Sequence, residues 1–146
     1  MARVEQVGTV ELSREECLSL LAGAPFGRLV LTEGALPAVL PVNFLLDSAG
    51  IVIRTAEGSI TSLADGSVVA FQADSIDPVR QAGWTVTVVG RATVVRDELQ
   101  RSRLAALPLR PWAPGRRDTL VVVDLGLVSG RRIGGAEPAH AGSDAG

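Results

Sequence analysis

The segment Ile53–Ile60, IRTAEGSI, combines residue types that bind phosphate. It contains the guanidinium of Arg54, the hydroxyls of Thr55 and Ser59, and a flexible turn at Gly58. If a strand ends at Arg54 and a short helix opens at Ser59, the first N–H groups of that helix point outward and form an anion site with the arginine. The same residues also fit an ordinary strand-to-helix turn in which Ser59 is the N-cap. Both interpretations stay open at this point.

A second group of residues has the chemistry to hold a flat heterocycle. The run Pro41-Val42-Asn43-Phe44 offers backbone groups that a proline-containing strand leaves unpaired, and an amide side chain that can bond the edge of a polar ring. Trp84 and Trp112 are the only tryptophans, and each lies next to glycine or proline. Either indole can form the wall of a ring site, and the alternatives are a core position for Trp84 and a loop plug for Trp112.

Acid–base machinery is scarce in this chain. Its one histidine, His140, lies in the predicted tail near the end of the chain. A Ser-His-Asp or Cys-His site is therefore not expected, and a zinc site is not expected either. If the protein is an enzyme, a cofactor must carry the reaction while the protein binds and orients it.

The composition indicates one soluble domain. The chain has 146 residues, 47% of them apolar, and a net charge of −2, so nothing global attracts it to nucleic acid or to an anionic membrane. A single cysteine excludes an internal disulfide. The N-terminus lacks the apolar core of a signal peptide, and no apolar run approaches the ~20 residues of a membrane span. We therefore expect a cytoplasmic protein, and the arginine-only basic set suggests a GC-rich bacterial source.

The chain reads as consecutive short strands with a few short helices. Ser13-Arg14-Glu15-Glu16 has the form of a capping box at the start of a helix. Helices are predicted at residues 13–22, 59–65 and 97–107. Strands are predicted at residues 26–32, 35–47, 50–56, 67–76, 83–97 and 119–133. Pro37 and Pro41 predict that the second strand is an edge or is bulged. In the long fifth strand, Trp84, Val86 and Val88 share one face, and Gly90 allows a bend.

Strands that follow one another without long helices between them favour an antiparallel barrel over a doubly wound α/β fold. The predicted fold is mainly β: a six-stranded antiparallel split β-barrel with two or three short helices. Residues 1–133 would form this domain, and residues 134–146, rich in small residues, a disordered tail.

The order of these motifs resembles the pyridoxamine 5′-phosphate oxidase-like family. The residues that carry the resemblance are ECLSLL, PFGRLVLT, LPAVLPVNF, IVIRTAEGS, VVAFQAD, GWTVTVVGRATVV and ALPLRPWAPGRRD, and they cover about residues 10 to 133. Members of that family are FMN-binding split β-barrels and usually homodimers. The resemblance implies a flavin-dependent oxidoreductase that acts on a small molecule, with no protein residue as acid or base.

The resemblance also assigns roles to residues. The strand with Val42, Asn43 and Phe44 would line the isoalloxazine ring, and Arg54, Thr55, Ser59 and the Ile60 backbone would hold the ribityl phosphate. Trp84 would lie near the ring, and the loop with Trp112 and Arg116 would reach the cofactor of the other subunit. A site shared in this way requires a dimer.

Ile60 departs from the family pattern. Related chains typically place a lysine there, and the loss of one charged hydrogen bond would weaken FMN about ten- to a hundredfold. Two alternatives follow from this departure. One is a reductase that uses the deazaflavin F420, and the other is a non-catalytic split-barrel binding dimer whose cofactor site has weakened.

Overall fold

The computed structural model describes residues 9–55, 64–109 and 119–134. Within these ranges the protein is mainly β, with nine strands and two helices. The strands are β1 Thr9–Glu11, β2 Gly27–Glu33, β3 Leu36–Val42, β4 Leu45–Asp47, β5 Gly50–Thr55, β6 Val68–Asp77, β7 Ala82–Val94, β8 Thr119–Val123 and β9 Leu127–Ile133. The helices are α1 Arg14–Ala22 and α3 Glu98–Ala105. The mainly β class predicted from the sequence is confirmed.

All strand pairs are antiparallel, and the strands follow the order β3-β2-β6-β7-β8-β5-β4. In addition, β9 pairs with β7, and β1 pairs with β9. β7 is the common strand, because its first part pairs with β6 and β9 and its last three residues pair with β8. It changes partner at Gly90, where an added Cβ would overlap the Asp124 carbonyl of the link between β8 and β9. A glycine at this position lets the two segments approach closely.

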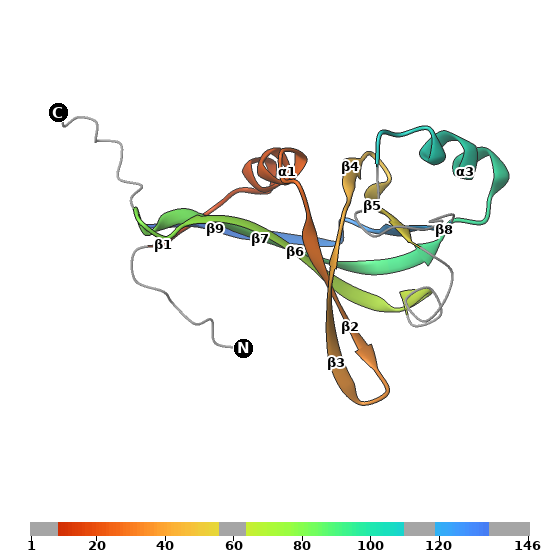
Figure 1. Cartoon of the computed structure of the whole chain (residues 1–146), viewed down its shortest axis with the longest axis horizontal. Coiled ribbons are helices and arrows are strands. Elements are labelled where there is room, and N and C mark those ends of the chain that lie inside the picture. The colour runs from red at the N-terminus through yellow and green to blue at the C-terminus, as the bar shows by residue number, and fades with distance from the viewer. Residues whose placement is uncertain (1–8, 56–63, 110–118, 135–146) are drawn as a thin grey trace.

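The barrel is open on one side. β3 and β4 are consecutive in the chain and stand at the two ends of the strand order, yet in the described residues they do not pair with each other. The β2–β3 hairpin instead projects away from the side of the sheet that α1 covers (Figure 1). The edge position predicted for the proline-containing strand is confirmed, since β3 pairs with β2 alone.

The strand count differs from the six predicted, for a local reason. The apolar run 35–47 divides at Asn43 and Phe44, because β3 pairs with β2 and β4 pairs with β5. The run 119–133 likewise divides into β8 and β9, which pair with different parts of β7. β1 is a short addition beside β9. Asn43 and the segment from Asp124 to Gly126 lie at these two divisions, but they do not indicate which strand each half pairs with.

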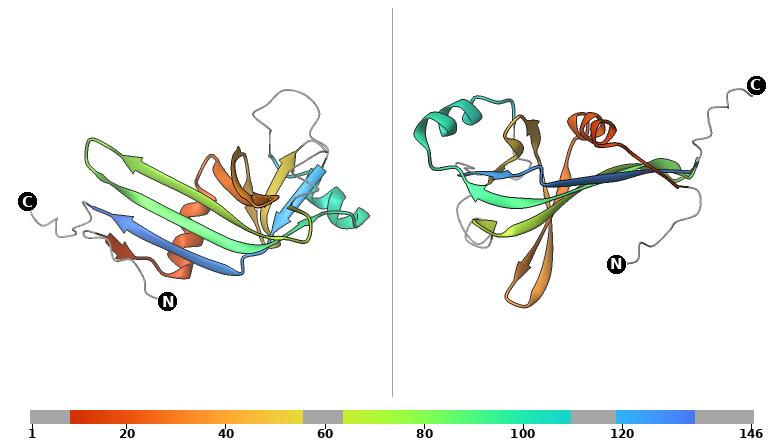
Figure 2. Two further views of the ribbon diagram at one scale, coloured as in Figure 1. Left: turned by 90° about the horizontal axis from the view of Figure 1, so that it is seen from below. Right: turned by 180° about the vertical axis from the view of Figure 1, so that it is seen from behind.

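Both described helices match predicted ones. In α1, the Ser13 hydroxyl accepts from the Glu16 N–H at 3.1 Å, and the Glu16 carboxylate accepts from the Ser13 N–H at 2.8 Å. The predicted capping box is therefore present. Asp97 caps α3 by accepting from the Gln100 N–H at 3.0 Å. The short helix predicted at 59–65 falls mostly outside the described residues. Figure 2 shows α1 and α3 at different parts of the sheet.

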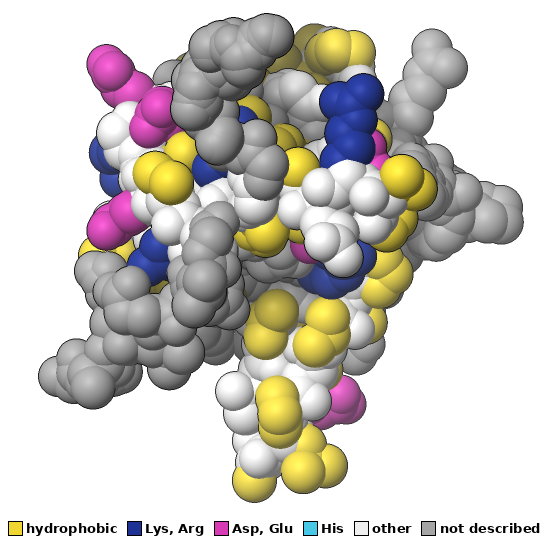
Figure 3. Space-filling model, turned by 90° about the vertical axis from the view of Figure 1, so that its left-hand side faces the viewer, with side chains coloured by type: hydrophobic (Ala, Val, Ile, Leu, Met, Phe, Trp, Pro, Cys, Tyr) yellow, Lys and Arg dark blue, Asp and Glu magenta, His cyan; other side chains and the backbone are white. Residues whose placement is uncertain are grey.

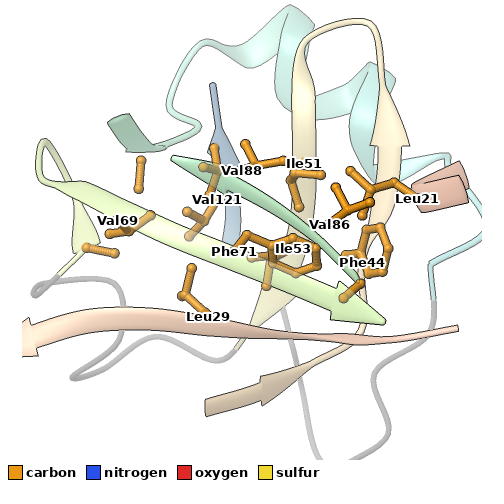
Figure 4. Packing of buried hydrophobic residues seen from close by; sticks show 14 of the residues in the cluster. Leu21, Leu29, Phe44, Ile51, Ile53, Val69, Phe71, Val86, Val88 and Val121 are labelled. Carbon is orange, nitrogen blue, oxygen red and sulfur yellow. The ribbon is translucent and has the colours of Figure 1, made fainter. Parts of the chain in front are cut away.

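Two hydrophobic clusters hold the fold together. In the larger one, Phe44 meets Phe71 edge to face, with ring centroids 4.6 Å apart, among the side chains that Figure 4 labels. Val86 and Val88 of β7 are fully buried there and Trp84 is partly buried, so the predicted face of this strand is confirmed. The smaller cluster lies under α3 and contains Val52, Val95, Leu104, Leu109, Leu120 and Val122.

Candidate functional site

Arg54 lies near the end of β5, opposite Leu120 of β8. Its Nη2 donates to the carbonyl of Ala105, the last residue of α3, at 2.8 Å. The guanidinium thus lies at the end of the helix where unpaired carbonyls and the negative end of the dipole favour a cation. Arg54 neither points into bulk solvent nor pairs with a carboxylate of the described chain.

The Nε of Arg54 is buried and has no hydrogen-bond partner among the described residues. Buried polar groups without partners are rare in folded proteins and commonly mark the place of an absent water or ion. An anionic oxygen is the acceptor that a guanidinium N–H binds best. The arginine predicted to hold a phosphate therefore has donor capacity that fits such a group.

Asn43 shares this part of the structure with Arg54. The β4–β5 ladder ends at the pair of Leu45 with Val52, and Asn43 lies two residues before this pair while Arg54 lies two residues after it. A continuation of the same register would place Asn43 opposite Arg54. Leu45 and Val52 pack with the cluster under α3, so the two polar residues continue the face that α3 covers. The β4–β5 hairpin thus connects the neighbourhoods of two predicted site residues that lie eleven positions apart.

The neighbours of Asn43 occupy different environments. Val42 ends β3 and pairs with Gly27 of β2. The Phe44 ring is 5% exposed and belongs to the main core, so this residue can offer a ligand its backbone but not its ring. Thr55 closes β5 opposite Thr119.

Trp84 lies far from Arg54 within one chain. It pairs with Arg132 of β9 near the start of β7, whereas Arg54 lies level with the end of β7, across β8. The eleven strand residues from Trp84 to Val94 span on the order of 30 Å along β7. One chain therefore does not bring Trp84 and Arg54 to the same small ligand. The other predicted site residues, Ser59, Ile60, Trp112 and Arg116, lie outside the described residues.

Sequence reasoning did not find the ion pair that anchors α3. Arg103 donates to both carboxylate oxygens of Asp47, at 3.2 and 3.1 Å, and the Ala49 N–H donates to the same carboxylate at 2.9 Å. The turn DSAG after β4 signals the bond to Ala49. Nothing in the sequence signals Arg103, which lies 56 positions away.

A groove of about 490 Å³ opens on the other end of α3. It lies between the start of the helix and the β7–β8 pair, with Val94, Val95 and Val122 among its apolar residues. Asp97 and Asp124 line it as well. The groove does not include Arg54 or Asn43, so it is separate from the anion-binding candidate.

Neither a metal-binding cluster nor a reactive thiol is found among the described residues. No group of three or more histidine, cysteine or acidic side chains gathers in the described ranges in a way that could hold a metal ion. The single cysteine, Cys17, is a fully buried residue of α1, and burial raises the pKa of its thiol. Neither described helix is long and apolar enough to cross a membrane.

Comparison with known proteins identifies the family. Residues 13–132 match the pyridoxamine 5′-phosphate oxidase family. The chain belongs to this family. The protein Rv0080 of Mycobacterium tuberculosis is 43% identical over 130 residues, which is 85% of each chain.

Solved structures of the pyridoxamine 5′-phosphate oxidase type share the fold. The FAD-binding protein of Mycobacterium smegmatis is 34% identical, with a TM-score of 0.72, over 84% of this chain and 96% of that one. A conserved protein of Corynebacterium diphtheriae is 32% identical, with a TM-score of 0.74, over 86% of this chain and 98% of that one. The resemblance stated from the ordered motifs is confirmed, and the fold is that of a split barrel.

The Asp47–Arg103 pair predicts how stability depends on pH. The Arg103 guanidinium holds the pKa of Asp47 below its usual range, and the Ala49 N–H lowers it further. A depressed carboxyl pKa stabilises the folded state at neutral pH, and that stabilisation starts to disappear as the pH falls below about 4, the usual pKa of an unfolded aspartate. Asp47→Asn should therefore unfold more easily than wild type at neutral pH, and the difference should narrow in acid. Urea unfolding at several pH values measures this, and a difference that does not change with pH would contradict it.

Proposed function

We propose that this chain is a flavin-dependent oxidoreductase that acts on a small molecule, with FMN as its cofactor. The observation that carries the proposal is Arg54, fixed at the end of α3 with a buried Nε that has no partner among the described residues. Asn43 lies in the link between β3 and β4, just before the strand that pairs with β5. Membership of the pyridoxamine 5′-phosphate oxidase family and the FAD-binding relative from Mycobacterium smegmatis support a flavin.

The protein's part in this chemistry is binding and orientation. A bound flavin supplies hydride transfer at its ring. Arg54 would bind the anionic end through its unpartnered Nε–H, and Asn43 would bond the polar edge of the ring or the chain that joins ring and phosphate. Phe44 and Ile53, the chain neighbours of Asn43 and Arg54, are buried in the main hydrophobic cluster. They would exclude water from that side of the site. Thr55, Ser59 and the backbone of Ile60 would complete the phosphate contacts.

The identity of the flavin is the first matter to test. Apo protein titrated with FMN, FAD, F420 and riboflavin should bind a phosphate-bearing flavin in preference to riboflavin, because riboflavin offers Arg54 no anion. FAD is included because the Mycobacterium smegmatis relative is FAD-binding.

Arg54→Gln should weaken FMN binding about ten- to a hundredfold, the effect of losing a charged hydrogen bond. Tighter binding of F420 would favour the deazaflavin reductase, and no binding at high micromolar concentration of any flavin would contradict the proposal.

Ile60 separates a weakened cofactor site from a lost one. Ile60→Lys restores the cation that related chains carry, and FMN affinity should rise about ten- to a hundredfold. Ile60→Gln is the matched control, since it adds length and polarity without charge. No gain from the lysine would favour the non-catalytic binding dimer, the second candidate function, for which Ile60 is the motivating residue.

A homodimer is part of the proposal. The arm formed by β2 and β3 projects from the molecule, and Figure 3 shows apolar side chains along it. All seven residues of β3 are apolar, with Leu36 71% and Val39 59% exposed. An exposed apolar surface of this kind marks an interaction site. Trp84 and Arg54 lie far apart in one chain, so a second copy would be needed to set both beside one flavin.

The dimer predicts a mass and a variant that changes it. Sedimentation of the wild type should give twice the 15.2 kDa of the single chain. Val39→Arg puts a charge on the arm and should produce monomers, because an unpaired charge in an apolar interface is costly. Val79→Arg, at a position 90% exposed in the β6–β7 turn, is the control and should stay dimeric. A monomeric wild type would overturn this part of the proposal.

A further inference from the structure

The last turn of α3 lies along the β4–β5 hairpin and contacts it at three successive residues. Arg103 reaches Asp47 of β4, beside the hairpin turn. Leu104 is 1% exposed and packs in the same cluster as Val52 of β5. The carbonyl of Ala105 accepts from Arg54 near the other end of β5. The position of the helix end relative to Arg54 is thus set by contacts made along the whole hairpin.

The Asp47–Arg103 pair is the directional part of this anchor. Both carboxylate oxygens accept from the guanidinium, and such a two-bond pair fixes orientation as well as distance. The Asp47 side chain is only 13% exposed and is held in turn by the Ala49 N–H. The Arg103 side chain is 50% exposed. The aspartate on the strand is therefore the more restricted member of the pair, and the arginine extends to it from the helix. Hydrophobic packing of Leu104 alone would allow the helix end to rotate.

Arg54 needs such support because an arginine side chain has many rotamers. A long side chain binds an anion well when another contact has already restricted it. Here the Ala105 carbonyl holds one nitrogen of the guanidinium, and the Nε remains for a further acceptor. If the helix end moves, Arg54 loses its carbonyl partner and its fixed orientation together.

We propose that Asp47 and Arg103 are positioning residues for the anion site, which act by holding the C-terminal end of α3 on Arg54. Neither residue touches the anion. The inference rests on the proposed function only for the identity of the ligand as a flavin phosphate. Its distinctive consequence is that loss of the pair affects binding of the phosphate and leaves binding of the ring unchanged.

The first measurement compares FMN with riboflavin. Dissociation constants for both are determined by flavin fluorescence for the wild type, Asp47→Asn and Arg103→Gln. Asp47→Asn keeps the volume of the side chain and an oxygen for the Ala49 N–H, so it tests the pair without removing the turn. We expect FMN to bind about tenfold more weakly to both variants, and the riboflavin constant to stay within about twofold of wild type. Equal weakening of both flavins, or no weakening of FMN, would overturn the inference.

Arg96→Gln is the matched control. Arg96 also pairs with an aspartate, Asp65, at 3.0 Å, and lies just before α3, but its side chain is 70% exposed. The substitution removes the same charge from the same part of the chain without touching the β4–β5 hairpin. It should leave the ratio of the two constants at the wild-type value, and a change as large as that of Arg103→Gln would show a general charge effect and overturn the inference.

The second measurement needs no flavin. The Nε–H resonance of Arg54, assigned by its loss in Arg54→Lys, is followed in the wild type and in Arg103→Gln while pyrophosphate is added. A shift in the wild type that is absent in Arg103→Gln supports the positioning role even if no flavin binds, in which case only the proposed function fails. The same shift in both proteins, or no shift in the wild type, would overturn the positioning role.

Discussion

The structure depends on one strand that serves two sheets. β7 has 13 residues and pairs with β6 and β9 over its first part and with β8 over its last. Strands twist, and a single strand long enough to change partners carries that twist from one sheet into the other. Gly90 permits the change, because its missing side chain leaves room for the Asp124 carbonyl. Both hydrophobic clusters rest on this strand, through Val86 and Val88 in one and Val95, just beyond its end, in the other.

The open barrel explains where a ligand site can form. β5 pairs with β8 on one side and with the short β4 on the other, so Arg54 lies where the ladder is running out. At such a place, strand pairing does not use all of the polar backbone and side-chain groups, and a ligand can bind to those that remain. α3 covers this end of the hairpin and uses one nitrogen of Arg54 as its cap. The same helix that stabilises the fold therefore shapes the candidate anion site.

Family membership establishes the shared architecture, whereas the individual contacts come from the structure of this chain. The match over residues 13–132 shows the family, and the relatives from Mycobacterium smegmatis and Corynebacterium diphtheriae show that chains of this kind share the architecture. The contacts of Asp47, Arg103 and Arg54 are observed in the structure of this chain itself.

The sequence by itself determined the features that depend on neighbouring residues. The capping box of α1, the edge position of a strand with two prolines, the buried face of β7 and the mainly β class all follow from local chemistry and period-two alternation. It also singled out Arg54 and Asn43, because their residue types and order are distinctive. Only the tertiary structure decided that the run 35–47 divides into β3 and β4, that Trp84 on β7 lies far from Arg54 on β5, and that Arg103 reaches Asp47. These depend on which strand each segment pairs with, and pairing over many tens of residues is set by the packing of the whole barrel, which leaves no local mark in the sequence.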